Sequence, residues 1–413
     1  MSVSKRLIQA PMYYIQCDWE DHLNKISGEI WVSCKYKEQP SKHGKLVRMN
    51  ICSDAGNPAV TATEDFNVNL LTHNAIQIGL KDSKFSCIFL APRSIYSSVH
   101  KKSVTSLDIV EGSSCVSVSV DDDSNVAVWL ADGEHKLITF TEHVGTVYKC
   151  RWFPSGKVIL SYGADMNLKI WCSETGRCPV SLKGHKKAIT DSAFVDRGRN
   201  IVSVSKDGVC KLWDCGEAIC IDNLLEINCC INCCSISTCP NNYRLPESGS
   251  PPHERESGTD DKIVLTGSEE GDIHCIGIRS RKVLFSLKLQ SAVNCCCCIK
   301  PGIFVAGCQD GSIHLISVEN TDHIITSWLE TNNPALSIMP YQENGFFVGH
   351  NDGSCVYRSI IDLDSTIRLN LTGPDGDPIY DICCDNKFIY TACRDSCIRK
   401  YSPDSYIVRH FQS

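Results

Sequence analysis

Serine, histidine and aspartate recur together along this chain of 413 residues, and cysteine gathers in two dense groups. A serine beside a histidine and an aspartate is the arrangement that many nucleophilic hydrolases use. Four cysteine thiolates can instead bind zinc tetrahedrally. The spacing of the serine, histidine, aspartate and cysteine residues predicts which strands and turns hold them. It therefore distinguishes catalytic or metal-binding roles from purely structural ones.

The serine, histidine and aspartate residues repeat in phase with tryptophan. Three segments end at tryptophans spaced 42 and 42 residues apart, with an aspartate six residues before each tryptophan and a serine four residues before each aspartate. Histidines spaced 43 and 42 residues apart precede them. This period and these residue types predict WD-repeat blades, each a four-stranded sheet of a β-propeller. The three sets are His100, Ser119, Asp123 and Trp129; His143, Ser161, Asp165 and Trp171; and His185, Ser203, Asp207 and Trp213.

Each of these sets is predicted to form a buried hydrogen-bonded relay. The histidine would lie in the loop that enters a blade, the serine in its second strand, the aspartate in the following turn and the tryptophan in the third strand. Each buried donor then has an acceptor. Because the relay occupies these side chains, and because no GxxxxGK[ST], GxGxxG or HExxH motif occurs, we expect a non-enzymatic protein without a cofactor or metal.

Four later segments keep the acidic turn but lose the rest of the pattern. The tryptophan is replaced by an aliphatic residue, an arginine or a tyrosine, and the entering histidine is missing. Valine, isoleucine, phenylalanine and tyrosine surround each turn, as in β-hairpins. We expect these blades to be held by apolar packing alone. The turn residues are Glu270, Asp310, Asp352 and Asp395, and the residues in place of tryptophan are Ile276, Ile316, Arg358 and Tyr401.

The repeats therefore predict an all-β fold, a seven-bladed WD-repeat propeller over residues 96–413. Seven complete four-strand units are expected from Val104 onward, the last ending at residues 406–411. Residues 1–95 do not repeat and are predicted to form a small, mostly β domain against the propeller, part of which is a candidate to add a strand at the closure. Strand-like segments in it cover residues 13–19, 28–36, 45–53, 59–66 and 75–80.

One interval between acidic turns is 63 residues, and it contains an insertion over residues 238–261. The insertion is rich in proline, serine, glycine and charge, a composition typical of a disordered loop. By position it joins the first and second strands of blade four, on the face opposite the aspartate turns. We interpret it as a passive insertion; a regulatory or phosphorylated loop is the alternative.

The cysteine groups fall on predicted first strands, those nearest the channel, of blades four and five. Alternation along a strand sends neighbouring side chains to opposite faces, whereas zinc ligands usually converge from turns. Inner strands are buried on both faces and favour small apolar side chains such as free cysteine. Core packing is therefore the favoured interpretation, with metal or redox chemistry as the alternative. The groups are Cys229, Cys230, Cys233 and Cys234, and Cys295, Cys296, Cys297 and Cys298.

Charge is unevenly distributed along the chain. Residues 1–100 hold 11 basic and 9 acidic residues, whereas residues 101–413 hold 30 and 39, and the whole chain has a net charge of −7. An acidic body disfavours nucleic acid and favours a basic protein partner. Lys183, Lys186 and Lys187 interrupt the acidic end at blade three. A merely solvated rim is the alternative. The candidate partner-binding residues at the end carrying the aspartate turns are Asp121, Asp122, Glu269, Asp272, Glu330, Asp375 and Asp377.

Targeting features are weak. The chain has no apolar run of about 18 residues, the length that would predict a transmembrane helix. Its first residues lack an apolar stretch long enough for a secretory signal. We therefore expect a cytoplasmic and nuclear protein that has no membrane contact, is a monomer on its own, and keeps its 27 cysteines as reduced thiols.

Several motifs closely resemble the proteasomal ATPase-associated factor family. They are FPSG at residues 153–156, VDRGRNIVS at 195–203, LWDCG at 212–216, KFSCIFLAP at 84–92 and DGSC at 352–355. The resemblance covers nearly the whole chain. It implies an assembly chaperone of the proteasome regulatory particle, which binds the C-terminal domain of an ATPase subunit and restrains premature docking onto the core particle. No contact residues of the family are carried over.

Two other functions remain open from the sequence. A generic WD-repeat scaffold, such as a substrate receptor of a ubiquitin ligase, would have the same fold. Receptors that join the cullin-four adaptor typically show Trp-Asp-x-Arg, whereas Trp213-Asp214 is followed here by Cys215-Gly216. A nucleic-acid or ribosome-assembly propeller would need basic loops, which the acidic repeats lack.

Overall fold

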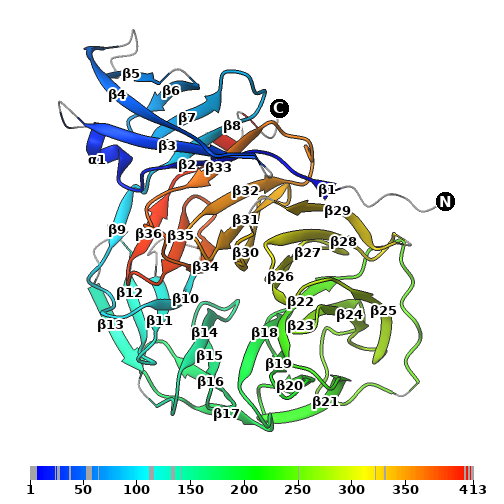
Figure 1. Ribbon diagram of the computed structural model, residues 1–413. Coiled ribbons are helices and arrows are strands. Elements are labelled where there is room, and N and C mark those ends of the chain that lie inside the picture. The colour runs from blue at the N-terminus through cyan, green and yellow to red at the C-terminus, as the bar shows by residue number, and fades with distance from the viewer. Residues whose placement is uncertain are drawn as a thin grey trace.

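The alternating apolar pattern folds into blades arranged in a ring around a central channel in the computed structural model (Figure 1). The structure describes residues 7–23, 25, 28–36, 39–52, 58–63, 65–110, 116–131, 135–140, 142–249, 251–320, 322–329, 332–403, 406–407 and 410. Over these residues the ring has seven blades, and one further sheet lies beside it. The predicted WD-repeat propeller is confirmed.

Blades one to three are antiparallel sheets with the strand order of the chain. Their second strands are almost entirely buried, because neighbouring blades cover both faces. Blade one contains β10 (Val104–Ile109), β11 (Val116–Asp121), β12 (Val126–Leu130) and β13 (His135–Phe140). Blade two contains β14 (Val147–Trp152), β15 (Val158–Gly163), β16 (Asn167–Cys172) and β17 (Val180–Lys183). Blade three contains β18 (Ile189–Val195), β19 (Asn200–Ser205), β20 (Val209–Asp214) and β21 (Ile219–Glu226).

Blades four to six continue the same pattern. Blade four contains β22 (Ile231–Thr238), β23 (Lys262–Ser268), β24 (Asp272–Gly277) and β25 (Lys282–Lys288). Blade five contains β26 (Val293–Lys300), β27 (Ile303–Cys308), β28 (Ser312–Ser317) and β29 (Ile324–Leu329). Blade six contains β30 (Ala335–Tyr341), β31 (Gly345–His350), β32 (Cys355–Ser359) and β33 (Ile367–Leu371).

Blade seven is completed by a strand from the other end of the propeller. It contains β34 (Ile379–Cys384), β35 (Ile389–Cys393) and β36 (Ile398–Tyr401), and its outer strand is β9 (Ser94–Tyr96), which pairs antiparallel with β36. The prediction that residues 406–411 supply this strand was wrong, since Tyr406 and Ile407 lie in a helical turn. Tyr96 is buried, with its ring centroid 5.1 Å from that of Trp129 in blade one. The ring thus closes through an early segment.

The N-terminal region is mostly β, as predicted, and some of its strands join sheets of the propeller. β2 (Met12–Ile15), β3 (Glu29–Lys35), β4 (Lys42–Cys52) and β5 (Pro58–Ala62) form a separate sheet, with α1 (Trp19–Leu23) between β2 and β3. β6 (Phe66–Thr72), β7 (Ala75–Leu80) and β8 (Ser86–Leu90) extend blade six, because β8 pairs parallel with β33. β1 (Leu7–Ile8) pairs parallel with β29. The predicted boundary at residue 95 falls inside β9.

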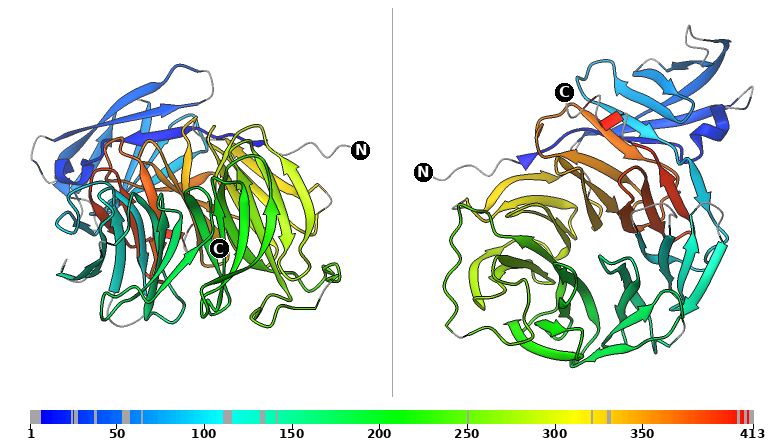
Figure 2. Two further views of the ribbon diagram at one scale, coloured as in Figure 1. Left: turned by 90° about the horizontal axis from the view of Figure 1, so that it is seen from below. Right: turned by 180° about the vertical axis from the view of Figure 1, so that it is seen from behind.

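Two further views show these N-terminal strands against the side of the ring formed by blades six and seven (Figure 2). Trp19 is fully buried there, and its indole N–H donates to Thr372 Oγ1 at 3.0 Å. Arg368 of β33 donates to the Pro11 carbonyl at 3.1 Å. Among the described residues, no helix has the length and apolar character needed to cross a membrane.

The insertion in blade four connects β22 to β23, as predicted, but the described part of it is fixed to blades three and four. Glu256 pairs with Arg281 at 2.8 Å, and the Asn200 side chain bonds the backbone of Arg255 and Ser257 at 3.1 and 2.7 Å. The expectation of a disordered loop is therefore corrected. Composition indicated too few apolar contacts for folding, but an ion pair and amide hydrogen bonds anchor the loop instead.

Candidate functional site

The predicted relays are present in blades two and three. His143 Nδ1 lies 2.7 Å from Asp165 Oδ2, His143 Nε2 lies 2.6 Å from Ser161 Oγ, and the Trp171 indole N–H donates to the same serine oxygen at 2.7 Å. The corresponding distances among His185, Asp207, Ser203 and Trp213 are 2.9, 2.7 and 2.8 Å. Burial lowers the pKa of His185, which favours a neutral ring. These side chains hold the entering loops against the blades.

In blade one the relay uses Asp121 in place of the predicted Asp123. His100 Nδ1 lies 2.9 Å from Asp121 Oδ2, and Asp121 Oδ1 also accepts from the backbone N–H groups of Asp123 and Asn125. His100 Nε2 and Trp129 Nε1 both reach Ser119 Oγ, at 2.6 and 3.0 Å. Asp123 is exposed. Three consecutive aspartates occupy this turn, so spacing could not identify the buried one.

Matched alanine substitutions distinguish these two aspartates. Asp121→Ala is expected to lower the free energy of unfolding by about 2–3 kcal/mol, because the His100 ring and two backbone N–H groups lose their acceptor. Asp123→Ala is expected to change it by less than about 0.5 kcal/mol. Urea unfolding of both variants checks this. Equal losses of unfolding free energy in the two variants would indicate that Asp123 also belongs to the relay.

Blades five to seven also contain polar contacts at the acidic turns, which corrects for these blades the expectation of apolar packing alone. Asp395 forms an ion pair with the buried Arg399 of β36. Asp352 accepts from Asn333 Nδ2 at 2.7 Å, and Asp310 accepts from Ser312 Oγ at 2.6 Å. These blades therefore keep the turn carboxylate and replace the histidine with other donors. Ile276, Ile316 and Tyr401 are buried, and apolar packing is extensive. Arg358 is also buried, so blade six has a guanidinium at the position that tryptophan occupies in blades one to three.

We call the end of the ring that holds the turns between second and third strands the Asp-turn face. Of the candidate partner-binding residues, Asp122, Glu269 and Asp375 are exposed on it. Asp121 is buried in the relay, which corrects its assignment as a docking residue. Asp272 pairs with Lys288 at 3.0 Å and Asp377 with Arg394 at 2.8 Å. Glu330 lies outside the described residues.

Basic residues divide the same face. Lys101 and Lys102 follow His100 in blade one, and Lys186 and Lys187 follow His185 in blade three, all exposed, as is Lys183 at the end of β17. The exposed Glu269 and Glu270 lie in blade four, across the ring from blade one. The Asp-turn face therefore has exposed lysines at blades one to three, and exposed carboxylates at Asp122 in blade one, at Glu269 and Glu270 in blade four and at Asp375 between blades six and seven; we call these carboxylates its acidic part.

Paired charges line the central channel, and sequence reasoning did not single them out. Lys149 pairs with Asp191 at 3.1 Å, and Arg151 pairs with Asp381 at 2.7 Å. Asp381 also accepts from Ser106 Oγ at 2.7 Å, which links blades seven, one and two. The signal was available: charged residues in the middle of predicted inner strands need partners.

Comparison with known proteins decides the family. The chain is 38% identical over 388 residues, 94% of its length, to the proteasomal ATPase-associated factor 1 of Gallus gallus, of which it covers 97%. Its identity to the protein of that name from Homo sapiens is also 38%, over 387 residues. The chain belongs to the proteasomal ATPase-associated factor family.

Two other matches agree with this family. The model of the "WD domain, G-beta repeat" family matches residues 134–172 and 176–214, which run from the outer strand of blade one, β13, to the third strand of blade three, β20. The 26S proteasome regulatory subunit RPN14 of Saccharomyces cerevisiae is 33% identical over 158 residues, 38% of this chain and 37% of that protein. These matches are to associated factors and WD-repeat proteins, and they indicate no enzyme family.

In this member of the proteasomal ATPase-associated factor family, the cysteine groups lie on β22 and β26 or just before β22. Cys233, Cys234, Cys295 and Cys297 are buried. Burial raises the pKa of the Cys234 and Cys295 thiols, and a hydrogen bond with Cys233 together with burial raises that of Cys296. Protonated thiols suit a packing role, because metal ligation and redox reactions need thiolates.

A different set of groups could hold a metal ion. One thiol and two carboxylates, those of Cys229, Glu270 and Asp272, offer ligand atoms within 4.8 Å of one another on the Asp-turn face. The ammonium of Lys288 lies 3.0 Å from Asp272 and 4.0 Å from Glu270. The lysine pairs most closely with Asp272 and competes with a cation for this carboxylate.

Proposed function

We propose that this protein is an assembly chaperone of the proteasome regulatory particle that binds the C-terminal domain of a proteasomal ATPase subunit. In this role it would restrain premature association of the particle with the core particle, in the cytoplasm and nucleus. The observation that carries the proposal is the 38% identity to proteasomal ATPase-associated factor 1 over 94% of the chain and 97% of that relative. Identity of that extent includes the N-terminal region as well as the blades.

The acidic part of the Asp-turn face is the proposed docking surface. Asp122, Glu269, Glu270 and Asp375 are exposed there, and the turn that carries Asp122 is held by the buried Asp121. Such a surface would attract a basic ATPase domain and raise its association rate. Exposed charge pairs contribute little individually, so the client could be released by competition or salt.

The N-terminal region borders this acidic surface. Burial and then the nearby carboxylate of Asp375 raise the pKa of the Cys17 thiol, and burial and then Asp352 raise the pKa of Tyr14 to about 12. Residues just before α1 thus approach the turns of blades six and seven. A client bound at the acidic surface would lie within reach of the N-terminal sheet, which gives the non-repeating region a place in recognition.

Pull-down against the isolated C-terminal domains of the six proteasomal ATPase subunits tests the proposal. A variant with Asp122 and Asp375 changed to Asn, and Glu269 and Glu270 changed to Gln, keeps the buried Asp121 and the ion-paired Asp272 and Asp377. We expect wild type to bind one or two subunits selectively and the variant to bind at least tenfold more weakly at low salt.

The matched control removes the same number of charges from the opposite face, by Glu174→Gln, Glu254→Gln, Asp260→Asn and Asp362→Asn, all at exposed positions. It is expected to bind as wild type does. If both variants bind equally well, the ATPase role stands and the docking surface is elsewhere. If no subunit binds wild type, the proposed function is wrong.

A further inference from the structure

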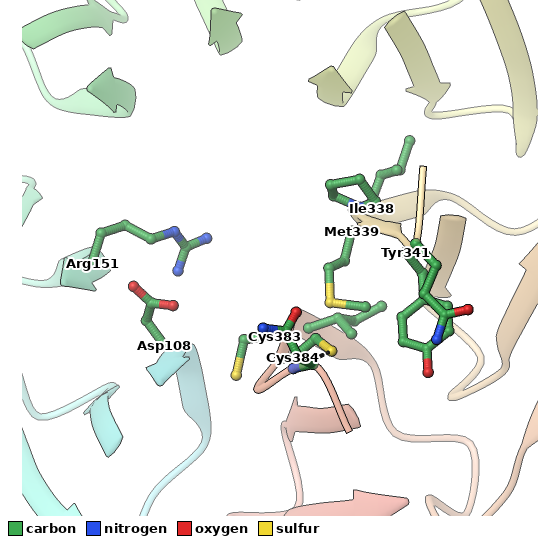
Figure 3. A pocket seen from close by; sticks show the side chains of 11 residues that line it. Asp108, Arg151, Ile338, Met339, Tyr341, Cys383 and Cys384 are labelled. Atoms are coloured by element: carbon green, nitrogen blue, oxygen red, sulfur yellow. Dashed lines mark hydrogen bonds between the residues drawn. The ribbon is translucent and has the colours of Figure 1, made fainter. Parts of the chain in front are cut away.

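A pocket opens at the end of the central channel opposite the Asp-turn face. It has a volume of about 390 Å³. The first strands of blades one, two, six and seven line it near the points where they end, together with the turns that follow β30 and β34. Figure 3 shows Asp108 and Arg151 on one side, Ile338, Met339 and Tyr341 on the other, and Cys383 and Cys384 between them.

The charges around this pocket do not balance. Lys149 and Arg151 are already paired with Asp191 and Asp381, and the two Arg151–Asp381 contacts are 2.7 and 3.1 Å. Asp108 is a third carboxylate, whose oxygens accept from the backbone N–H groups of Ile109 and Trp152 at 2.9 and 2.7 Å. Burial raises the pKa of Asp108 to about 6, against the nearby Arg151. An ionised Asp108 therefore leaves the pocket with excess negative charge.

The remaining lining suits a long side chain. Met339 and Ile382 offer apolar surface, Tyr341 offers a ring, and Gln342 and Asn386 bring amide groups to the pocket. Glu343 follows Gln342 in the same turn and is exposed, which adds a negative charge near the opening. Lys387 directs its ammonium over the Phe388 ring, 5.1 Å from the centroid. A side chain with an apolar stem and a cationic head complements the apolar surface and the negative charge of this pocket.

We propose that this pocket binds an arginine or lysine side chain of a partner protein, with the stem against Met339 and Ile382 and the cationic head at Asp108. The site lies on the face opposite the proposed ATPase-docking surface, so it stands independently of that function. It would let the propeller hold two protein segments at once, one at each end of the channel. The charged and titratable groups facing Asp108 are Arg151, Asp381, Cys150 and Cys383.

The methyl group of Met339 reports directly on this pocket, because Met339 lines it. The chain has five methionines, so labelling their methyl groups gives few signals. Full-length protein labelled with ¹³C at the methionine methyls is titrated with the peptides acetyl-Gly-Arg-Gly-amide and acetyl-Gly-Lys-Gly-amide, followed by NMR. We expect the Met339 signal, assigned by Met339→Leu, to shift saturably at pH 7.5. The signal of Met166, which is 41% exposed on the Asp-turn face, should not move.

Charge dependence provides the decisive comparisons. Asp108→Asn is expected to weaken binding about tenfold or more, because it removes the charged acceptor. Asp123→Asn, at an exposed position on the other face, should leave binding unchanged. In wild type, binding should also weaken below about pH 6, as Asp108 takes up a proton, which gives a second measurement if Asp108→Asn does not fold.

Three results would overturn the proposal. They are an equal Met339 shift with acetyl-Gly-Gln-Gly-amide, binding that persists in a folded Asp108→Asn protein, and no shift with either basic peptide. A response to spermidine without one to the peptides would reassign the pocket from a partner protein to a small amine.

Discussion

Asp381→Ala is expected to lower the free energy of unfolding by about 3–5 kcal/mol, the cost typical of removing one partner from a buried ion pair. Asp381 belongs to blade seven, accepts from Ser106 Oγ and the Leu107 N–H of blade one at 2.7 and 3.1 Å, and pairs with Arg151 of blade two. Its loss leaves the partly buried guanidinium of Arg151 without its carboxylate at the junction of three blades. Urea unfolding at pH 7 measures the effect.

The pH dependence of this loss follows from the pKa of Asp381. Burial alone would raise this pKa, but Arg151 and the hydrogen bond with it outweigh burial and hold it below 3.8. A lowered pKa in the folded state stabilises the protein above the unfolded value of about 3.8, and this contribution is lost as pH falls further. The difference between wild type and Asp381→Ala should therefore shrink below about pH 4.

A surface substitution controls for the general effect of removing an aspartate. Asp362 is exposed in the turn between β32 and β33, and Asp362→Ala is expected to change the free energy of unfolding by less than about 0.5 kcal/mol. If Asp381→Ala proves as stable as Asp362→Ala at pH 7, the channel charges do not hold the blades together.

The sequence predicted the blades where a period could be measured. In blades two and three, a serine and an aspartate four residues apart identify the relay, and the structure places His143, Asp165, His185 and Asp207 in it. Blade one departs because its turn offers three aspartates, and the buried one stands two residues after Ser119. Burial and backbone donors select among them, and neither is encoded in spacing.

Other features escaped because they depend on contacts between distant segments. The composition of the insertion predicts disorder, yet Glu256 within it pairs with Arg281, 25 residues away along the chain. Asn200 donates to the backbone of the insertion at Arg255, 55 residues away. Asp108, Arg151 and Asp381 come from three blades, separated by up to 273 residues, and meet because all three lie on inner strands. Periodicity places strands, but it does not say which polar side chains share a channel.

The candidate docking residues show the same limit. Topology correctly places Asp122, Glu269 and Asp375 on exposed turns, whereas Asp121 is buried and Asp272 and Asp377 are paired with Lys288 and Arg394. Acidic residues in turns have both structural and surface roles, and the difference depends on neighbouring side chains. Fewer of the predicted candidate residues are therefore available for docking than topology alone predicted.

A chain shortened to begin at residue 97 is expected to lose at least about 4 kcal/mol of stability relative to one beginning at residue 91. Both lack β8, so the comparison isolates β9, the three-residue outer strand of blade seven. Without it, β36 becomes an open edge that invites aggregation. Removing Tyr96 also uncovers Trp129, a loss comparable to truncating a large buried aromatic residue.

Thermal unfolding and size-exclusion chromatography of the two shortened chains measure this difference, and full-length Tyr96→Ala supplies a third measurement if neither shortened chain is soluble. We expect the chain from residue 97 to aggregate, and Tyr96→Ala to remain monomeric but melt at a lower temperature. The reason is geometric: a ring of blades closes when its last sheet is complete, and here the completing strand comes from the region that the repeat pattern assigned to another domain. Equal melting temperatures for the two shortened chains would show that β9 does not close the ring.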